Sequence, residues 1–133
     1  MQDQSVKLSG APYRVYVRIC RMVLAAKDVD YELVPVDVFA EGGPDPEHLV
    51  RHPFGKIPAF CHGTFELFET DAIVSYVERA FEGRSLEFAN PVHNARMRQM
   101  MRIVDNYAYP VLVWKCYVPW SGEGQEVEAG SWP

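Results

Sequence analysis

Apolar residues in the first part of the chain recur at spacings that predict strands and helices in alternation. Residues 6–8 and 31–38 carry the short apolar or alternating runs that are typical of β-strands. Between them a helix is predicted, because apolar residues fall at intervals of four, seven, eight and eleven: Val15, Ile19, Met22, Val23 and Ala26. A helix that connects two strands favours a right-handed crossover, so we expect these strands to be parallel.

The next stretch predicts a short helix, a hairpin and a longer helix. Residues 40–46 are rich in Gly and Pro and indicate a loop, and residues 46–51 can form a helical turn. Two apolar runs, 59–61 and 65–68, flank a short turn and predict antiparallel strands. A helical stripe follows them: Ile73, Val74, Val77, Ala80 and Phe81. The predicted order of elements is β-α-β-α-β-β-α.

A second, less complete unit is predicted after residue 84. Asn90-Pro91 can cap and start a helix, whose apolar residues trace one stripe: Met97, Met101, Val104, Ala108 and Val111. Pro110 should kink or divide this helix. Residues 121–133 are rich in Gly and Glu, and we expect them to be disordered. The predicted domains are therefore 1–84, a partial helical region at 85–120 and a tail.

Composition narrows the class of protein. The chain has 133 residues, and an apolar share of 48% is ample for a packed core. A formal net charge of -5 argues against nucleic-acid binding, which usually needs a basic face. No run is long enough for a membrane span and the polar start MQDQSVK is unlike a signal peptide, so we expect a soluble, cytoplasmic protein. Three well-separated cysteines form neither a disulfide framework nor a CxxC redox motif: Cys20, Cys61 and Cys116.

The segment 52–70 sets an X-Pro loop beside a helix start, a layout that can hold a small peptide. Ile57-Pro58 stands just before an apolar strand, where proline is tolerated and an X-Pro bond can be cis. A visiting peptide could then pair with the backbone of Ile57 as an added strand. At the helix start, unpaired N–H groups suit a ligand carboxylate, and Glu69 suits an ammonium group. The alternative is that Thr70 merely caps the helix.

Three segments carry a combination of motifs: YELVPVDVF at 31–39, HPFGKIPAF at 52–60 and LFETDAIVSYVE at 67–78. In order and spacing they resemble the N-terminal domain of cytosolic glutathione S-transferases, especially bacterial members. The resemblance implies an α/β, thioredoxin-like fold followed by an all-helical C-terminal domain. This chain would hold little more than the first helix of that domain, so we expect a truncated form. The resemblance also implies a dimer, which the uncovered apolar faces of a lone helix favour independently.

The resemblance implies a glutathione site at the X-Pro loop and the helix start. Ile57, which precedes the loop proline Pro58, would pair through its backbone with the cysteinyl part of glutathione. Glu69 and Thr70 would hold the γ-glutamyl end, with threonine in place of the commoner serine.

Two further side chains complete the implied site. Lys56, with His52 nearby, would contact the glycyl carboxylate, and the alternative for Lys56 is a solvated surface lysine. His48 and His52 are also four residues apart, as on metal-binding helices. Leu49 stands where a zincin motif needs glutamate, however, and Pro53 restricts the helix at His52. We therefore expect no metal.

The group that activates the glutathione thiol is left open by the sequence. Such transferases lower the thiol pKa with a hydroxyl or cysteine near the start of the first helix. The expected serine falls at or next to Arg14, which could act by charge at the helix N-terminus. The nearest hydroxyls belong to Tyr13 and Ser9. The alternatives are that Tyr13 packs in the fold and that Arg14 forms a solvated stripe with Arg18 and Arg21.

A glutathione transferase is the function that the resemblance implies, with glutathione as co-substrate and a hydrophobic electrophile as acceptor of the thiol. The alternative is a non-catalytic, truncated binding or dimerisation module. Thiol-disulfide exchange is disfavoured, because Cys20 lies six positions beyond Arg14 and points away from the helix start.

Overall fold

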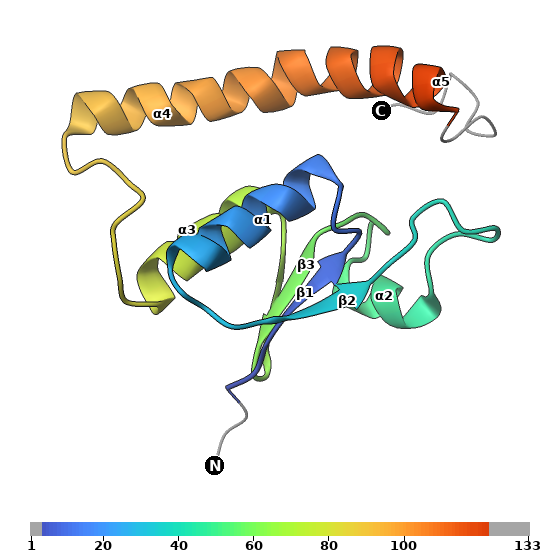
Figure 1. Cartoon of the computed structure of the whole chain (residues 1–133), viewed down its shortest axis with the longest axis horizontal. Helices are drawn as coiled ribbons and strands as arrows, with labels where there is room; N and C mark the ends of the chain where they lie inside the picture. Colours follow the sequence, from blue (N-terminus) through green and yellow to red (C-terminus); the bar gives the residue numbers. More distant parts are fainter. Residues whose placement is uncertain (1–3, 123–133) are drawn as a thin grey trace. The chain divides into compact units, whose positions relative to one another are not determined.

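The computed structural model describes residues 4–122, within two compact units: unit 1 (Met1–Leu86) and unit 2 (Glu87–Pro133). Unit 1 holds a four-stranded sheet with the strand order β2-β1-β3-β4 (Figure 1). The strands are β1 (Val6–Gly10), β2 (Glu32–Pro35), β3 (Ala59–His62) and β4 (Phe65–Phe68).

The sheet is mixed. β1 and β2 are parallel and are connected through helix α1 (Val15–Ala26), as the sequence predicts. β3 is antiparallel to both β1 and β4, and Ala59 lies opposite Ser9 on one side and Phe68 on the other. The end of β1, the start of β3 and the end of β4 therefore lie at the same edge of the sheet.

Two helices, α1 and α3 (Thr70–Ala80), pack side by side over the sheet (Figure 1). The third helix of unit 1, α2 (Pro46–Arg51), contacts β4 and is capped by the Asp45 carboxylate, which accepts from the Glu47 N–H at 2.8 Å. The core is one apolar cluster from the sheet and the helices: Val6, Leu8, Val17, Cys20, Leu24, Phe60, Ile73 and Val77. The predicted thioredoxin-like order of elements is confirmed.

The apolar face of α1 differs from the predicted one. The buried residues are Val17, Cys20 and Leu24, whereas Met22 is 69% exposed. Apolar residues occur on most sides of this helix, so more than one stripe satisfies a helical period and contact with the sheet selects among them. On α3 fewer stripes of apolar residues satisfy a helical period. The burial of Ile73 and Val77 confirms its predicted face.

From Pro91 to Ser121, unit 2 is one long helical stretch (Figure 1). The sequence predicted a kink or a division at Pro110, and the division does not occur. The backbone at Tyr109 stays helical, with φ -59° and ψ -47°, and hydrogen bonding changes to a π-helical pattern on both sides. The segments are α4 (Pro91–Ile103), η1 (Val104–Ala108), η2 (Pro110–Tyr117) and α5 (Val118–Ser121).

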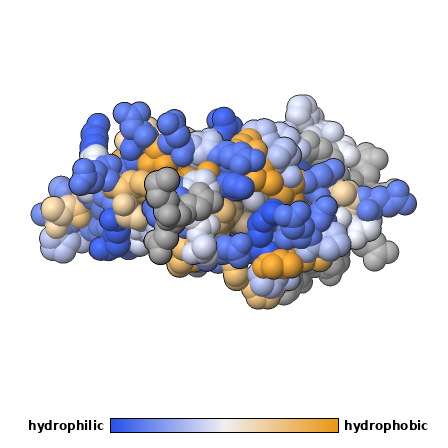
Figure 2. Space-filling model, turned by 90° about the horizontal axis from the view of Figure 1, so that it is seen from below, coloured by the Kyte–Doolittle hydropathy of each residue, from blue (hydrophilic) through white to orange (hydrophobic). Residues whose placement is uncertain are grey.

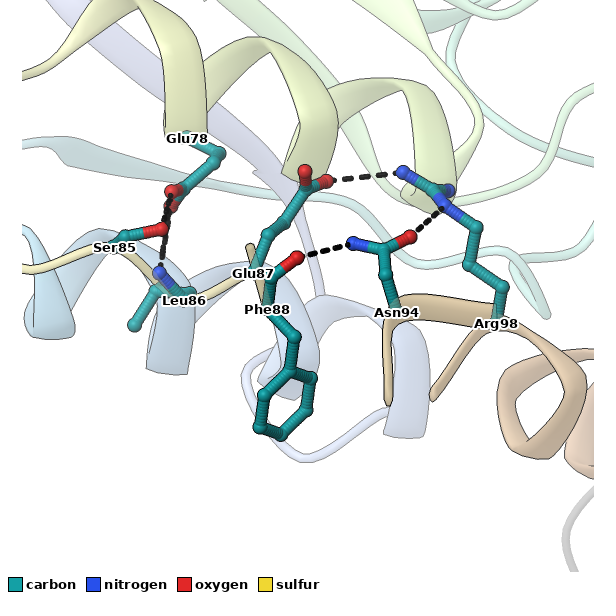
Figure 3. A network of polar contacts seen from close by, with 7 residues as sticks. All are labelled: Glu78, Ser85, Leu86, Glu87, Phe88, Asn94 and Arg98. Atoms are coloured by element: carbon teal, nitrogen blue, oxygen red, sulfur yellow. Dashed lines mark hydrogen bonds and ion pairs between the residues drawn. The ribbon is translucent and has the colours of Figure 1, made fainter. Parts of the chain in front are cut away.

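The start of α4 is held by polar contacts. The Asn90 side chain accepts from the backbone N–H groups two and three residues later, as the sequence predicts for a helix cap. Beside it, the Asn94 amide donates to the Phe88 carbonyl at 3.2 Å and Arg98 pairs with Glu87 at 3.0 Å (Figure 3). These contacts fix the entry of the chain into unit 2.

Figure 2 shows a face on which hydrophilic side chains dominate and several hydrophobic areas are separate from one another. Along α4, η1 and η2 no residue is buried. None of the helices within residues 4–122 has the length and apolarity needed to cross a membrane. From residue 123 onward, the tail predicted at 121–133 lies outside the described residues.

Candidate functional site

Three segments of unit 1 meet at one edge of the sheet. Ala59 lies opposite both Ser9 and Phe68. The segment after β1, the segment before β3 and the segment after β4 therefore come together at this edge. A Cβ atom placed on Gly10 would lie 2.5 Å from the Cγ2 atom of Val17, so glycine allows α1 to approach the end of β1 closely, and it would lie in ordinary contact, at 3.5 Å, with the Cβ atom of Ile57. The site is therefore built from the starts of α1 and α3 and the loop before β3.

We call residues 52–58 the proline loop. It begins with a turn in which the Gly55 N–H donates to the His52 carbonyl at 2.9 Å, with Gly55 at a φ of 64°. Lys56 is exposed, Ile57 is half-buried and Pro58 is buried. The Ile57-Pro58 peptide bond is cis, one of the two geometries that the sequence allowed.

The start of α3 is one residue earlier than a Thr70 cap would place it. The N-cap is Glu69, whose carbonyl accepts from the Ile73 N–H at 3.0 Å, and Thr70 is the first helical residue. Glu69 has a φ of 75° and a ψ of 118°, a conformation that few residues other than glycine adopt. Its exposed side chain makes no capping hydrogen bond, so this helix end keeps N–H groups that its N-cap side chain does not satisfy.

The start of α1 presents a positive charge. Arg14 is the N-cap, without a side-chain cap and without an acidic residue in the first turn. Its guanidinium carbon lies 4.5 Å from the centre of the Phe39 ring and 5.4 Å from that of Tyr13, within range of cation-π attraction. Tyr13 is 62% exposed, so the alternative of simple packing is wrong for this residue.

The remaining candidates near α1 lie away from solvent or have partners. Ser9 is buried within the central strand β1. Arg21 is not merely solvated, because it donates to the Pro12 carbonyl at 2.9 Å and to the Tyr31 hydroxyl at 3.2 Å. Burial raises the pKa of the Cys20 thiol to about 12, which leaves it protonated and unreactive at neutral pH.

His52 lies inside the proline loop rather than at its surface. Only 2% of the residue is exposed, and its ring centre lies 4.6 Å from that of Phe68 and 6.3 Å from that of Phe54. Burial lowers the pKa of His52, an effect that the negative charge of Glu69 partly opposes. The expectation that His52 touches a ligand carboxylate does not agree with this burial.

His48 supports the same loop from α2. It is 2% exposed, and its Nε2 atom lies 2.7 Å from the Lys56 carbonyl oxygen. The sequence argued against a metal at His48 and His52, whose ring centres lie 6.2 Å apart. Within residues 4–122 no three His, Cys, Asp or Glu side chains come together in a way that could hold a metal ion.

The family described as "Glutathione S-transferase, N-terminal domain" matches residues 4–79, more than half of the chain. The chain belongs to the glutathione S-transferase family. The match covers the whole sheet, the three helices of unit 1 almost to the end of α3, and the converging segments of the site.

Relatives and solved structures agree with this assignment. Glutathione S-transferase 1 from Zea mays is 40% identical over 74 residues, which cover 56% of this chain and 35% of the relative. A probable glutathione S-transferase from Oryza sativa subsp. japonica is 32% identical over 107 residues, which cover 80% of this chain and 50% of the relative. The Tau class glutathione S-transferase from mango, Mangifera indica, has a TM-score of 0.75 and 30% identity, with 83% of this chain and 50% of that chain covered. The chain spans half or less of the length of these relatives, all of which are plant proteins.

Two contacts in this glutathione S-transferase chain had no signal in the sequence. Phe39 packs against Arg14 from the loop that follows β2, and His48 reaches Lys56 across a turn. Both contacts depend on tertiary structure, which local motifs do not report.

Proposed function

We propose that this protein binds glutathione at the edge of the sheet where the proline loop meets the start of α3. The observation that carries the proposal is the pairing of Ala59 with Phe68 in antiparallel strands. Because of this pairing, the residues that precede Ala59 lie next to the residues that follow Phe68. These residues are Ile57-Pro58 and Glu69-Thr70, a backbone edge and an acidic helix start.

Each part of glutathione has a chemical counterpart in this proposal. The backbone of Ile57 pairs with the cysteinyl part as a short added strand. Glu69 pairs with the ammonium group of the γ-glutamyl end, and Thr70 with the N–H groups of α3 receives its carboxylate. Lys56, which is exposed, pairs with the glycyl carboxylate, and His52 supports the loop from inside.

We propose that Arg14 stabilises the glutathione thiolate, with the Tyr13 hydroxyl as a second donor. The positive end of α1 and the guanidinium group both favour a negative sulfur atom. The thiolate sulfur then forms a bond to an electrophilic carbon of a hydrophobic compound, and the bond from that carbon to its leaving group, such as chloride, breaks with the electron pair leaving on the chloride. Ser9 has no part in this step, because it is buried in β1.

The wider assembly is also a proposal. A glutathione-binding domain at 1–84 and a helical region at 85–120 are supported by the two compact units. Dimers are supported by the exposed apolar residues of unit 2, which include Tyr107, Leu112 and Trp120. Light scattering of the protein at micromolar concentration tests this, and a monomer would count against it. A bacterial type remains a prediction from sequence motifs.

A second candidate is a protein that binds glutathione without turnover. It is favoured by the absence of a hydroxyl at Arg14, whose guanidinium group is packed on Phe39. An assay with an activated aryl chloride and glutathione distinguishes the two candidates, because only a transferase raises the rate of chloride release above that of the uncatalysed reaction.

The first experiment is a calorimetric titration with glutathione, run on the protein and on Glu69→Ala. We expect saturable binding that the substitution weakens by about 1.5 to 3 kcal/mol, the usual range for a hydrogen bond to a charged group. Glu66→Ala is a matched control, because Glu66 is an exposed glutamate in the middle of β4. Equal binding by all three proteins would exclude Glu69 from the site.

A further inference from the structure

His48 makes one short polar contact from a buried position. Its Nε2 atom lies 2.7 Å from the Lys56 carbonyl oxygen, and the residue is 2% exposed. A carbonyl oxygen only accepts hydrogen bonds, so Nε2 carries the proton and donates it. Within the described chain the other ring nitrogen, Nδ1, is buried without a hydrogen-bond partner. The hydrogen bond to the Lys56 carbonyl is therefore the polar contact that this ring makes within the described chain.

The acceptor of this bond belongs to the peptide group that Lys56 shares with Ile57. The cis peptide bond recorded in residues 4–122 is the next one, Ile57-Pro58, so the Lys56-Ile57 peptide is trans. In a planar trans peptide the C=O and N–H bonds point in opposite directions. A donor that fixes the Lys56 carbonyl on the side of α2 therefore fixes the Ile57 N–H on the opposite side.

His48 also holds the loop through its own backbone. The His52 N–H donates to the His48 carbonyl at 2.8 Å, and the Gly55 N–H donates to the His52 carbonyl at 2.9 Å. These two bonds fix the first part of the proline loop, and the His48 ring fixes the peptide that follows. A hydrogen bond at the carbonyl also polarises the peptide and makes its N–H a better donor.

We propose that His48 is a positioning residue for glutathione, which orients and polarises the Ile57 N–H for the cysteinyl part of the ligand. This inference rests on the proposed function and adds a residue that does not touch the ligand. It also gives a reason for a buried histidine at a helix face where an apolar side chain would fill the same space.

The test compares two substitutions of one residue with a matched control. His48→Phe keeps a flat buried ring and removes the donor, whereas His48→Gln keeps an N–H group near the position of Nε2. His62→Phe is the control, because His62 also makes one ring hydrogen bond in unit 1, to the Tyr76 hydroxyl at 2.9 Å. His62 lies at the far end of β3 from the proline loop.

Two measurements are made on each protein: the dissociation constant for glutathione by calorimetry, and the amide proton shift of Ile57 by NMR without ligand. We expect His48→Phe to weaken binding about five- to tenfold, the effect of one neutral hydrogen bond, and to move the Ile57 amide signal upfield. His48→Gln should recover most of both effects, and His62→Phe should change neither.

The outcomes separate the inference from the proposed function. If the unsubstituted protein binds glutathione and a folded His48→Phe variant binds it equally well, the role of His48 is wrong and the proposed function stands. If His48→Gln is as weak as His48→Phe, packing rather than the donor is responsible, and the inference is again wrong. If the unsubstituted protein does not bind glutathione, the proposed function fails and the inference fails with it.

Discussion

Glu69 combines a backbone constraint and a proposed binding group in one residue. Its φ of 75° strains any residue that has a Cβ atom, and such strain is typical of functional positions. We expect Glu69→Ala to keep the strain and lose the carboxylate, whereas Glu69→Gly loses both. The glycine variant should therefore be more stable than the alanine variant by about 1 kcal/mol, while neither binds glutathione well.

Denaturant unfolding and calorimetry measure these two effects separately. Glu69→Gln serves as the control, because it keeps the size and the backbone strain of Glu69 and removes the charge alone. An alanine variant as stable as the glycine variant would show that the conformation of Glu69 is not strained. Glutathione binding by Glu69→Gly at full strength would show that the carboxylate has no role.

At the scale of single residues, sequence alone located the proline loop and the acidic helix start but not their conformations. Ile57-Pro58 and Glu69-Thr70 are local motifs, and local motifs are visible in a sequence. The positive φ of Glu69 and the burial of His52 are imposed by the tertiary structure around them. A histidine next to a proline on a loop reads as exposed unless the aromatic ring that covers it, Phe68, is known to lie there.

Helices α1 and α3 are joined by an ion pair between Lys27 and Glu78. The Lys27 Nζ atom lies 2.9 Å from a Glu78 carboxylate oxygen, and the two side chains are 2% and 10% exposed. Glu78 also accepts from the Ser85 hydroxyl at 2.8 Å and from the Leu86 N–H (Figure 3). Burial alone would raise the pKa of Glu78, but the hydrogen bonds from Lys27, Ser85 and Leu86 together hold it below its usual value of 4.5.

Removal of one partner should cost more stability than removal of both. We expect Lys27→Met to lower the free energy of unfolding by about 3 to 5 kcal/mol, because Glu78 is left buried without its cation. The double variant Lys27→Met with Glu78→Gln should recover most of this loss, since glutamine still accepts from Leu86. Denaturant unfolding at neutral pH measures both, and equal losses in the single and double variants would show that the unpaired carboxylate of Glu78 is not the cause of the loss.

The same pair predicts a pH dependence. Because the folded pKa of Glu78 is below its unfolded value, its contribution is complete above about pH 4.5 and is lost as the pH falls through the folded pKa. The stability difference between the protein and the double variant should therefore shrink only below about pH 4.5. A difference that is constant down to pH 3 would show that the pKa of Glu78 is not lowered.

At the scale of elements, the sequence predicted the helices and strands better than the faces they bury. The period of apolar residues identified the buried face of α3, but α1 has apolar residues on several sides and the wrong stripe was selected. Lys27 and Glu78 are 51 positions apart, so no local pattern could pair them. The helix through Pro110 continues because the hydrogen bonds around it shift to the π pattern, which proline alone does not reveal.

The molecule as a whole divides so that the proposed site and the apolar core lie in the same unit. Every residue of the core cluster falls between Val6 and Val77, and the residues proposed to act on glutathione fall between Tyr13 and Thr70. The family match ends at residue 79, also within unit 1. Unit 1 therefore has the parts that a folded, ligand-binding domain needs.

We expect a protein of residues 1–86 to unfold in one cooperative transition and to bind glutathione, because its core and its proposed site are complete. The affinity should stay within about twofold of that of the whole chain, the spread expected when two changes act independently. Calorimetric titration and thermal unfolding of both proteins measure this. Ile73→Ala in the shorter protein is the control for a real core, and it should lower stability by about 2 to 5 kcal/mol. If residues 1–86 fold but bind no glutathione while the whole chain does, unit 2 must contribute to the site.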